Sequence, residues 1–168
     1  MTSRSRPVVL VGFMGSGKSV VGALVAARAG APFRDLDQMI EVDAGEAVAA
    51  IFATRGEKAF RAIEKRLLPR ALEPGAVVAL GGGAIMDDES WLVVRTQALP
   101  VYLEVPFDAI WSRVAGAQDR PLIAGRTRAE VEALFEARRR RYEESPNRVG
   151  GGRAPEVVAD EVLKLWSD

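Results

Sequence analysis

The stretch GFMGSGKS at positions 12–19 follows an apolar run, VVLV at positions 8–11, and precedes a helical pattern that continues to Ala29. It fits the pattern G-x-x-x-x-G-K-[ST] in the strand-to-helix setting that this pattern requires. Gly12, Gly15 and Gly17 let backbone N–H groups approach phosphate oxygens closely, and the start of the helix adds the positive end of its dipole. The stretch therefore predicts a P-loop that binds a nucleoside triphosphate.

Two side chains at the end of this stretch suit triphosphate chemistry. Lys18 is expected to reach the outer phosphates as a point charge, solvated or paired with the ligand rather than packed. The Ser19 hydroxyl stands where a Mg²⁺ ion that bridges those phosphates needs an oxygen ligand. A glycine-rich turn without a ligand is the alternative, and the agreement of strand, glycines, Lys-Ser pair and helix argues against it.

The composition is that of a globular protein. A length of 168 residues suits a single domain, expected over residues 1–168, and 48% of the residues are hydrophobic. No apolar run approaches the roughly 18 residues that cross a bilayer. Positions 1–6 are basic, but a strand and the P-loop follow them instead of the apolar region and cleavage site of a signal peptide. We therefore expect a cytoplasmic protein with no membrane partner.

The residue types that the chain lacks restrict its chemistry. There is no cysteine and no histidine, which excludes disulfides, thiolate zinc sites and the usual general base. Carboxylates are the remaining side chains that readily accept a proton. The 23 basic residues balance 23 acidic ones, so the chain lacks the positive field of a nucleic-acid binder, and no nucleic-acid partner is expected.

Apolar strands alternate with helical patterns along the chain. Continuous apolar runs such as AVVAL at positions 76–80 indicate strands that are buried on both faces. This alternation is typical of a parallel sheet wrapped in helices, so the predicted fold class is α/β. Strands are predicted at 7–12, 32–35, 76–80 and 99–105, and helices at 18–29, 37–43, 46–53, 57–72, 87–96, 107–114, 127–144 and 155–166.

Two aspartates stand at the end of the predicted strand 32–35. Because residues two apart in an extended segment face the same way, Asp35 and Asp37 can point to one site. One could support a magnesium ion while the other accepts a proton. The alternative is that Asp37 only caps the next helix, and the D-x-D pattern alone favours that alternative.

Arg61 and Glu64 lie three residues apart on one predicted helix, so their side chains can meet. The carboxylate could hold the guanidinium still while the free edge of the guanidinium binds a carboxylate or phosphate in bidentate fashion. A solvated surface pair is the alternative, and it is the commoner one without further context.

Three consecutive glycines, Gly81, Gly82 and Gly83, follow the buried strand at 76–80. They expose bare backbone amides at the same end of the sheet as the P-loop, which suits close approach by a small polar ligand. A mobile turn is the alternative.

Residues 115–126 contain Gly116, Gly125 and a central Arg120. The segment has few large apolar side chains. We therefore expect a lid that is mobile without ligand and can close an arginine over transferring phosphate.

In the helix predicted at 127–144, Leu134, Arg138 and Tyr142 repeat every four residues and share a face. The four arginines at 138–141 could instead form a basic binding patch. Four consecutive residues surround a whole helical turn, however, so only one or two of them can point into a site.

The ordered set of motifs resembles the shikimate kinase family. The motifs are GFMGSGKS at 12–19, DLD at 35–37, FRxxE at 60–64, GGG at 81–83, RPL at 120–122 and LxxxR at 134–138, and the resemblance covers about residues 8–166. It implies a P-loop kinase fold with about five parallel strands, a substrate-binding region at about 36–64 and a lid at about 115–126. The implied activity is Mg²⁺-dependent transfer of the γ-phosphoryl group of ATP to the 3-hydroxyl of shikimate, in the chorismate route to aromatic amino acids.

The resemblance also implies roles for individual residues. Catalytic roles are implied for Asp37, Lys18 and Arg120, and positions near Mg²⁺ for Ser19 and Asp35. ATP contacts are implied for Gly12, Gly15, Ser16, Gly17, Lys18, Ser19, Arg113, Arg120 and Pro155. Arg113 and Pro155 match the positions that sandwich the adenine. Shikimate contacts are implied for Asp37, Arg61, Gly81, Gly82, Gly83 and Arg138. The two arginines match those that hold the shikimate carboxylate, and Glu64 matches the residue that orients the first of them.

The chain departs from the family pattern in two places. Arg139, Arg140 and Arg141 stand where the family often has Ala, Pro and Leu. Residues 144–153 replace a usually recognisable fifth strand, and Pro146 with three glycines predicts an irregular stretch there. The geometry of the sheet edge and of the adenine wall is therefore left open.

Two alternatives remain from the residues. Another small-molecule kinase of the same fold, acting on gluconate or an aminated shikimate, would share the P-loop, and aminoshikimate would also satisfy Asp37, Arg61 and Arg138. A non-catalytic nucleotide-binding module would be expected to lack Lys18, Asp37 or Arg120, and the chain has all three. We expect a monomer whose ligands are ATP and shikimate.

Overall fold

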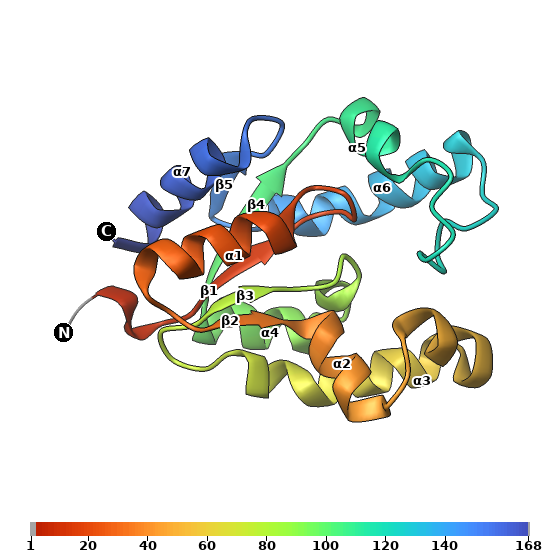
Figure 1. The fold of residues 1–168 in the computed structure, drawn as a ribbon, viewed down its shortest axis with the longest axis horizontal. Coiled ribbons are helices and arrows are strands. Elements are labelled where there is room, and N and C mark those ends of the chain that lie inside the picture. The colour runs from red at the N-terminus through yellow and green to blue at the C-terminus, as the bar shows by residue number, and fades with distance from the viewer. Residues whose placement is uncertain (1–2, 168) are drawn as a thin grey trace.

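The computed structural model describes residues 3–167, and its centre is a parallel β-sheet (Figure 1). Five strands lie in the order β2-β3-β1-β4-β5. They are β1 (Val8–Val11), β2 (Phe33–Asp35), β3 (Val77–Ala79), β4 (Leu99–Glu104) and β5 (Asn147–Gly150). The four strand pairings are parallel, which confirms the predicted α/β class.

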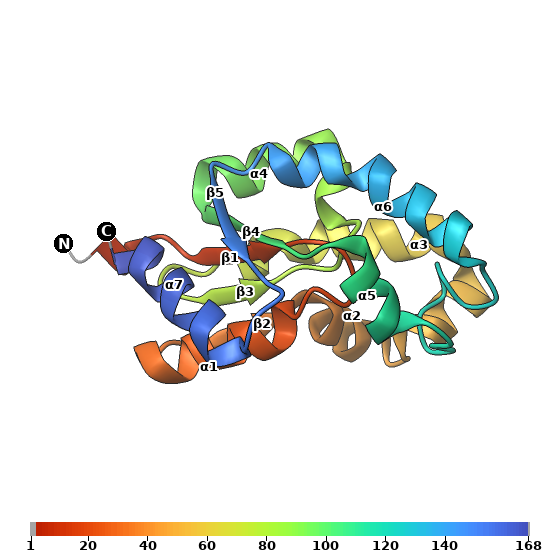
Figure 2. The same cartoon turned by 90° about the horizontal axis from the view of Figure 1, so that it is seen from above.

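Helices cover both faces of the sheet, as Figure 2 shows from above. They are α1 (Lys18–Ala29), α2 (Leu36–Ala44), α3 (Val48–Ala71), α4 (Asp88–Gln97), α5 (Phe107–Val114), α6 (Arg128–Glu143) and α7 (Pro155–Ser167), with short 3₁₀ helices η1 (Ser3–Ser5) and η2 (Ala84–Met86). Side chains alternate along β1: Val8 and Leu10 pack in a core with α1 and α7, whereas Val9 and Val11 pack in a core with α3, α4 and α6. Burial on both faces explains the continuous apolar run of this strand.

The prediction of an irregular stretch at 144–153 is wrong, because β5 occupies part of it. Residues Asn147–Gly150 pair in parallel with β4 at the edge of the sheet. Pro146 stands just before the first strand residue, where its missing N–H breaks no ladder hydrogen bond, and two of the three glycines follow the end of the strand. The entry into β5 is fixed by the Ser145 hydroxyl, which donates to the Pro100 carbonyl at 3.0 Å.

The two helices predicted at 46–53 and 57–72 adjoin in α3. Gly56 separates them, because its φ of 85° and ψ of 169° are not helical and produce a kink. No helix in the described part of the chain, α3 included, is long and apolar enough to cross a membrane.

Candidate active site

The P-loop connects β1 to α1 at the C-terminal end of the sheet. Gly15 and Gly17 have φ angles of 80° and 95°, in the left-handed region that glycine adopts without strain. A side chain at Gly15 would also be obstructed, because a Cβ there would lie 2.7 Å from Val114 Cγ1 of α5. The loop leads directly into the N-terminus of α1, where free N–H groups and the helix dipole favour an anion.

Lys18 is packed into the P-loop instead of extending into solvent. Its Nζ donates hydrogen bonds to the carbonyl oxygens of Gly12 at 2.6 Å and Phe13 at 3.0 Å, and the residue is 9% exposed. Burial lowers the pKa of Lys18 from 10.5 to about 7, while the charge of Asp37 raises it. The expectation of a lysine that is solvated rather than packed was wrong, because the loop carbonyls replace water around the ammonium group.

Ser19 and Asp35 meet beside the P-loop, where the Ser19 hydroxyl donates to Asp35 Oδ2 at 2.8 Å. The other carboxylate oxygen of Asp35 caps α2 and accepts from the backbone N–H of Asp37 at 3.0 Å. Within residues 3–167, no three acidic, His or Cys side chains group together as a metal cage would require. A hydroxyl and a carboxylate oxygen nevertheless fit Mg²⁺, which binds few protein oxygens beside substrate phosphates and water.

Asp37 lies on the first turn of α2, but it is not the cap of that helix. Because Asp35 occupies the cap position, the capping alternative for Asp37 is wrong. Burial, and then the charge of Asp35, raise the pKa of the Asp37 carboxyl above its usual range, while Lys18 lowers it. A Cβ at Gly81 would lie 3.0 Å from Asp37 Oδ1, so the carboxylate faces the glycines. A raised pKa suits a carboxylate that accepts a proton.

Arg61 and Glu64 form a partly buried ion pair on α3. The alternative prediction, a solvated surface pair, is therefore wrong. Arg61 Nη1 donates to Glu64 Oε1 at 2.8 Å, and Glu64 is 4% exposed. Burial raises the pKa of the Glu64 carboxyl, while Arg61 lowers it. The guanidinium also lies over the Phe60 ring, with Cζ 5.1 Å from the ring centroid. Glu57 Oε1 also lies 3.6 Å from Arg61 Nε, so two carboxylates hold the guanidinium, and its Nη2 group is left to face a ligand.

Arg138 points from α6 into the interior and is 6% exposed. Its Cζ lies 5.9 Å from the centroid of the Phe13 ring in the P-loop, and a Cβ at Gly82 would lie 3.2 Å from its Nη1. Arg139 and Arg141 instead pair with exposed carboxylates. The arginine run is therefore not a uniform basic patch, and Arg138 is the member of the run that lines a cavity beside the P-loop.

Two adjoining cavities bring the predicted residues together. Their volumes are about 450 Å³ and about 270 Å³. Both are lined by Met14, Asp37, Gly81, Gly82 and Arg120. The larger is also lined by Gly15, Ser16, Gly17, Lys18, Ser19, Asp35, Arg113 and Pro155. The smaller is also lined by Arg61, Gly83, Arg138, Val48, Phe52 and Phe60. Gly12 lines neither of these two cavities, and its carbonyl accepts the hydrogen bond from Lys18.

Some wall residues were not singled out in the sequence. Arg153 lines the larger cavity and is held by Glu161, with Nη1 and Nη2 donating at 2.6 Å and 2.7 Å. Its position two residues before Pro155 is the only signal that could have found it. Met14 lies between the cavities, and as a variable position of the P-loop pattern it carried no signal.

Residues 115–126 connect α5 to α6 without a helix or strand (Figure 1). Gly116 and Gly125 have φ angles of 77° and 74° near its two ends, and Arg120 reaches both cavities. We expect fast amide hydrogen exchange over this segment in the free protein and slower exchange with an ATP analogue, while the amides of β1 stay protected in both states. Exchange that is slow without ligand and unchanged by the analogue would contradict a lid.

The fold and the P-loop at the carboxyl ends of the strands define a P-loop kinase. A family model described as shikimate kinase matches residues 14–166. The chain belongs to the shikimate kinase family, a family of ATP-dependent kinases, and the predicted resemblance is confirmed.

Individual relatives agree with this assignment. The shikimate kinase of Streptomyces avermitilis is 46% identical over 159 residues, which cover 93% of this chain and 92% of the relative. A solved shikimate kinase from Acinetobacter baumannii in complex with shikimate has a TM-score of 0.90 and 29% identity, covering 95% of this chain and 92% of that one. A gluconokinase from Sinorhizobium meliloti, with a TM-score of 0.58 and 17% identity over 97% of this chain and 92% of its own, shares the fold alone. The gluconate alternative is therefore not favoured.

Proposed function

We propose that this chain transfers the γ-phosphoryl group of ATP to the 3-hydroxyl of shikimate, giving shikimate 3-phosphate and ADP. One observation carries the proposal: the cavity beside the P-loop and the cavity lined by Arg61 and Arg138 share Asp37 and Arg120 on their common wall. Two ligands that fill these cavities would meet at those side chains. Positioning of the reactants and stabilisation of charge account for most of the catalysis of phosphoryl transfer.

On the nucleotide side, the phosphates of ATP would bind the P-loop backbone and Lys18, and the adenine would lie between Arg113 and Pro155. Arg113 is already fixed to the P-loop, because its Nη1 donates to the Gly15 carbonyl at 2.7 Å. Ser19 and Asp35, which meet at this cavity, would hold Mg²⁺. When bound, the ion neutralises charge that develops on the phosphate oxygens.

On the acceptor side, Arg61 and Arg138 approach the smaller cavity from α3 and α6. Two guanidinium groups that converge from different helices can bind and orient one carboxylate, which suits the acid group of shikimate. The backbone amides of residues 81–83 would lie along the ring.

Asp37 would accept a hydrogen bond from the 3-hydroxyl and hold its oxygen in line with the γ-phosphorus. As the new O–P bond forms and the bond to the leaving ADP oxygen breaks, the hydroxyl proton passes to the Asp37 carboxylate. Lys18 and Arg120 would stabilise the charge on the transferring group.

We further propose that residues 1–168 form a single domain, which works as a monomer in the cytoplasm. One sheet with a core on each face, running through residues 3–167, supports the single domain. The balance of 23 acidic and 23 basic residues supports the proposal that nucleic acids and membranes are not partners. Light scattering at working concentration would test the monomer.

The test of the proposed function is an ADP-release assay with a panel of hydroxy acids. We expect ATP- and Mg²⁺-dependent ADP release with shikimate, and the product shikimate 3-phosphate by mass spectrometry. Gluconate should give only the background rate, and an aminoshikimate arm measures how far the amine replaces the hydroxyl. No ADP release above background with shikimate would refute the proposal.

A conservative change at Arg61 tests its assignment to the acceptor. Arg61→Lys keeps the charge but loses the planar fork, so we expect the Kd for shikimate to rise roughly tenfold while the Kd for ATP changes little. Arg55→Lys, on the exposed face of the same helix, is the matched control. Weaker ATP binding with normal shikimate binding would show that Arg61 has been given the wrong role.

A further inference from the structure

The three glycines at 81–83, called here the glycine turn, lie so close to the acceptor-binding groups that a side chain at any of them would be crowded. A Cβ at Gly83 would lie only 2.5 Å from Arg61 Nη2, and a Cβ at Gly82 only 3.2 Å from Arg138 Nη1. At Gly81 the nearest atom is Asp37 Oδ1, at 3.0 Å. The backbone of the turn therefore sets the spacing among the groups that the proposed function assigns to shikimate.

The carbonyl groups of the glycine turn show what holds it in place. The Gly81 and Gly83 carbonyls accept from backbone N–H groups only three residues ahead, at 3.1 Å and 3.2 Å, within the turn and η2. The Gly82 carbonyl instead accepts from the hydroxyl of Tyr142 at 2.5 Å, across 60 residues of chain. Of the hydrogen bonds to these three carbonyls, the one from the Tyr142 hydroxyl connects the turn to α6.

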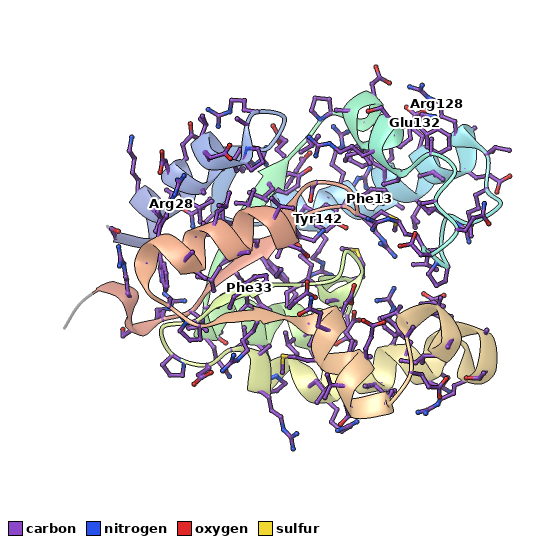
Figure 3. All side chains as sticks on the ribbon, in the orientation of Figure 1. Phe13, Arg28, Phe33, Arg128, Glu132 and Tyr142 are labelled. Atoms are coloured by element: carbon purple, nitrogen blue, oxygen red, sulfur yellow. The ribbon has the colours of Figure 1, made fainter. Side chains whose placement is uncertain are left out.

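Tyr142 is itself rigidly placed. It is 0% exposed, and its ring stacks on that of Tyr102 with centroids 5.5 Å apart at an angle of 28°. Figure 3 labels it in the middle of the molecule. Burial raises the pKa of the Tyr142 hydroxyl, so the hydroxyl keeps its proton and acts as the donor to the Gly82 carbonyl.

Tyr142 also shares its helix with a proposed ligand of the acceptor. It follows Arg138 by four residues on α6, so both side chains leave the same face of the helix. A Cβ at Gly82 would lie 3.3 Å from the Tyr142 hydroxyl and 3.2 Å from Arg138 Nη1. The same face of α6 thus presents Arg138 to the ligand and the Tyr142 hydroxyl to the glycine turn.

We propose that Tyr142 is a positioning residue for the acceptor site, and that its hydroxyl fixes the glycine turn at the point where Asp37, Arg61 and Arg138 converge. This inference rests on the proposed function, because it concerns the binding of shikimate. Tyr142 lines neither cavity, so it acts on the site only through the turn. Gly82 lines both cavities, but Arg61 and Arg138 line only the smaller one, so shikimate binding should depend on Tyr142 more than ATP binding does.

The test is Tyr142→Phe, which removes one hydroxyl and keeps the stacked ring. We expect the Kd for shikimate to rise about tenfold, because the Gly82 carbonyl loses its hydrogen bond from Tyr142 and the turn can shift. The Kd for ATP should stay within about twofold of wild type. Amide exchange at residues 81–84 should become faster. Tyr102→Phe is the matched control, because it removes a hydroxyl from the other ring of the same stack.

The outcomes separate the inference from the proposed function. A wild-type protein without shikimate-dependent ADP release refutes the function. An active wild type whose Tyr142→Phe variant binds shikimate normally refutes only the inference. Equal loss of shikimate and ATP binding, with a melting temperature far below that of Tyr102→Phe, indicates a general packing role and also overturns the inference.

A second variant keeps the test decisive if Tyr142→Phe folds poorly. Gly82→Ala leaves Tyr142 in place but puts a methyl group 3.3 Å from its hydroxyl and 3.2 Å from Arg138 Nη1. We expect a larger loss of affinity for shikimate than for ATP, because the crowding displaces the turn from α6. Normal shikimate binding by Gly82→Ala would show that the spacing between the glycine turn and α6 does not control shikimate affinity, and would contradict the inference.

Discussion

Asp37→Asn is expected to lower kcat by at least about 10²-fold, while ATP affinity and melting temperature stay close to wild type. Asparagine keeps the size and hydrogen-bonding capacity of the side chain but removes its charge and basicity. With no histidine or cysteine in the chain, a proton leaving the acceptor hydroxyl goes to a carboxylate, to water or to the phosphate. Phosphoryl transfer is loose, so placing the hydroxyl can contribute as much as removing its proton.

The pH profile sharpens this prediction. The Asp37 carboxyl has to be ionised to accept a proton. Burial and the charge of Asp35 raise its pKa, so wild-type kcat should rise with pH, and this rising limb should lie above the usual pKa range of an aspartate. Asp37→Asn should lose that limb. Asp43→Asn, an exposed carboxylate on the same helix, should keep both rate and limb. Unaltered turnover in Asp37→Asn would remove Asp37 from the mechanism.

Lys18→Met is expected to reduce phosphoryl transfer by at least about 10²-fold, because a charge that stabilises the transferring phosphate is lost. The melting temperature should change by no more than about 4 °C, the shift that ~1 kcal/mol produces in a chain of this size. Two hydrogen bonds to loop carbonyls disappear, but so does an ammonium group whose burial lowers its pKa to about 7.

The control for Lys18→Met is Lys58→Met, which removes an exposed lysine from α3. This variant should match wild type in turnover and in melting temperature. Near-normal turnover of Lys18→Met would refute the assignment of the P-loop lysine. A large fall in its melting temperature, with the control unchanged, would show that the ammonium group is a structural element of the loop.

The sequence predicted the P-loop and the sheet well because both depend on short-range patterns. A strand, three glycines, a Lys-Ser pair and a helix occupy one continuous stretch, so their meeting requires no knowledge of the rest of the fold. The state of Lys18 depends instead on which oxygens surround it after folding, and the pattern does not contain that information. For the same reason, the sequence did not show which of Asp35 and Asp37 caps α2.

Edge strands are harder to predict from local sequence, because the strand beside them supplies the hydrogen bonds that make them strands. Pro146 and the nearby glycines lower the local preference for a strand, yet β4 offers a complete ladder that Asn147–Gly150 can join. Tyr142 illustrates the same limit at a side chain. Helical spacing placed it on the face of Arg138, but the carbonyl that it bonds lies 60 residues away.

The glycine turn has a consequence for drug resistance. An inhibitor that rests on residues 81–83 would lie on bare backbone, where an added Cβ would come within 3.2 Å of Asp37, Arg61 or Arg138. Mutations that block such a compound would block the natural ligand too, because the same atoms are displaced. Resistance would then be expected on the apolar wall of the same cavity, at positions such as Val48 and Phe52, where a change of shape leaves the polar groups in place. Compounds designed against the turn should therefore select fewer escape variants than compounds designed against that apolar wall.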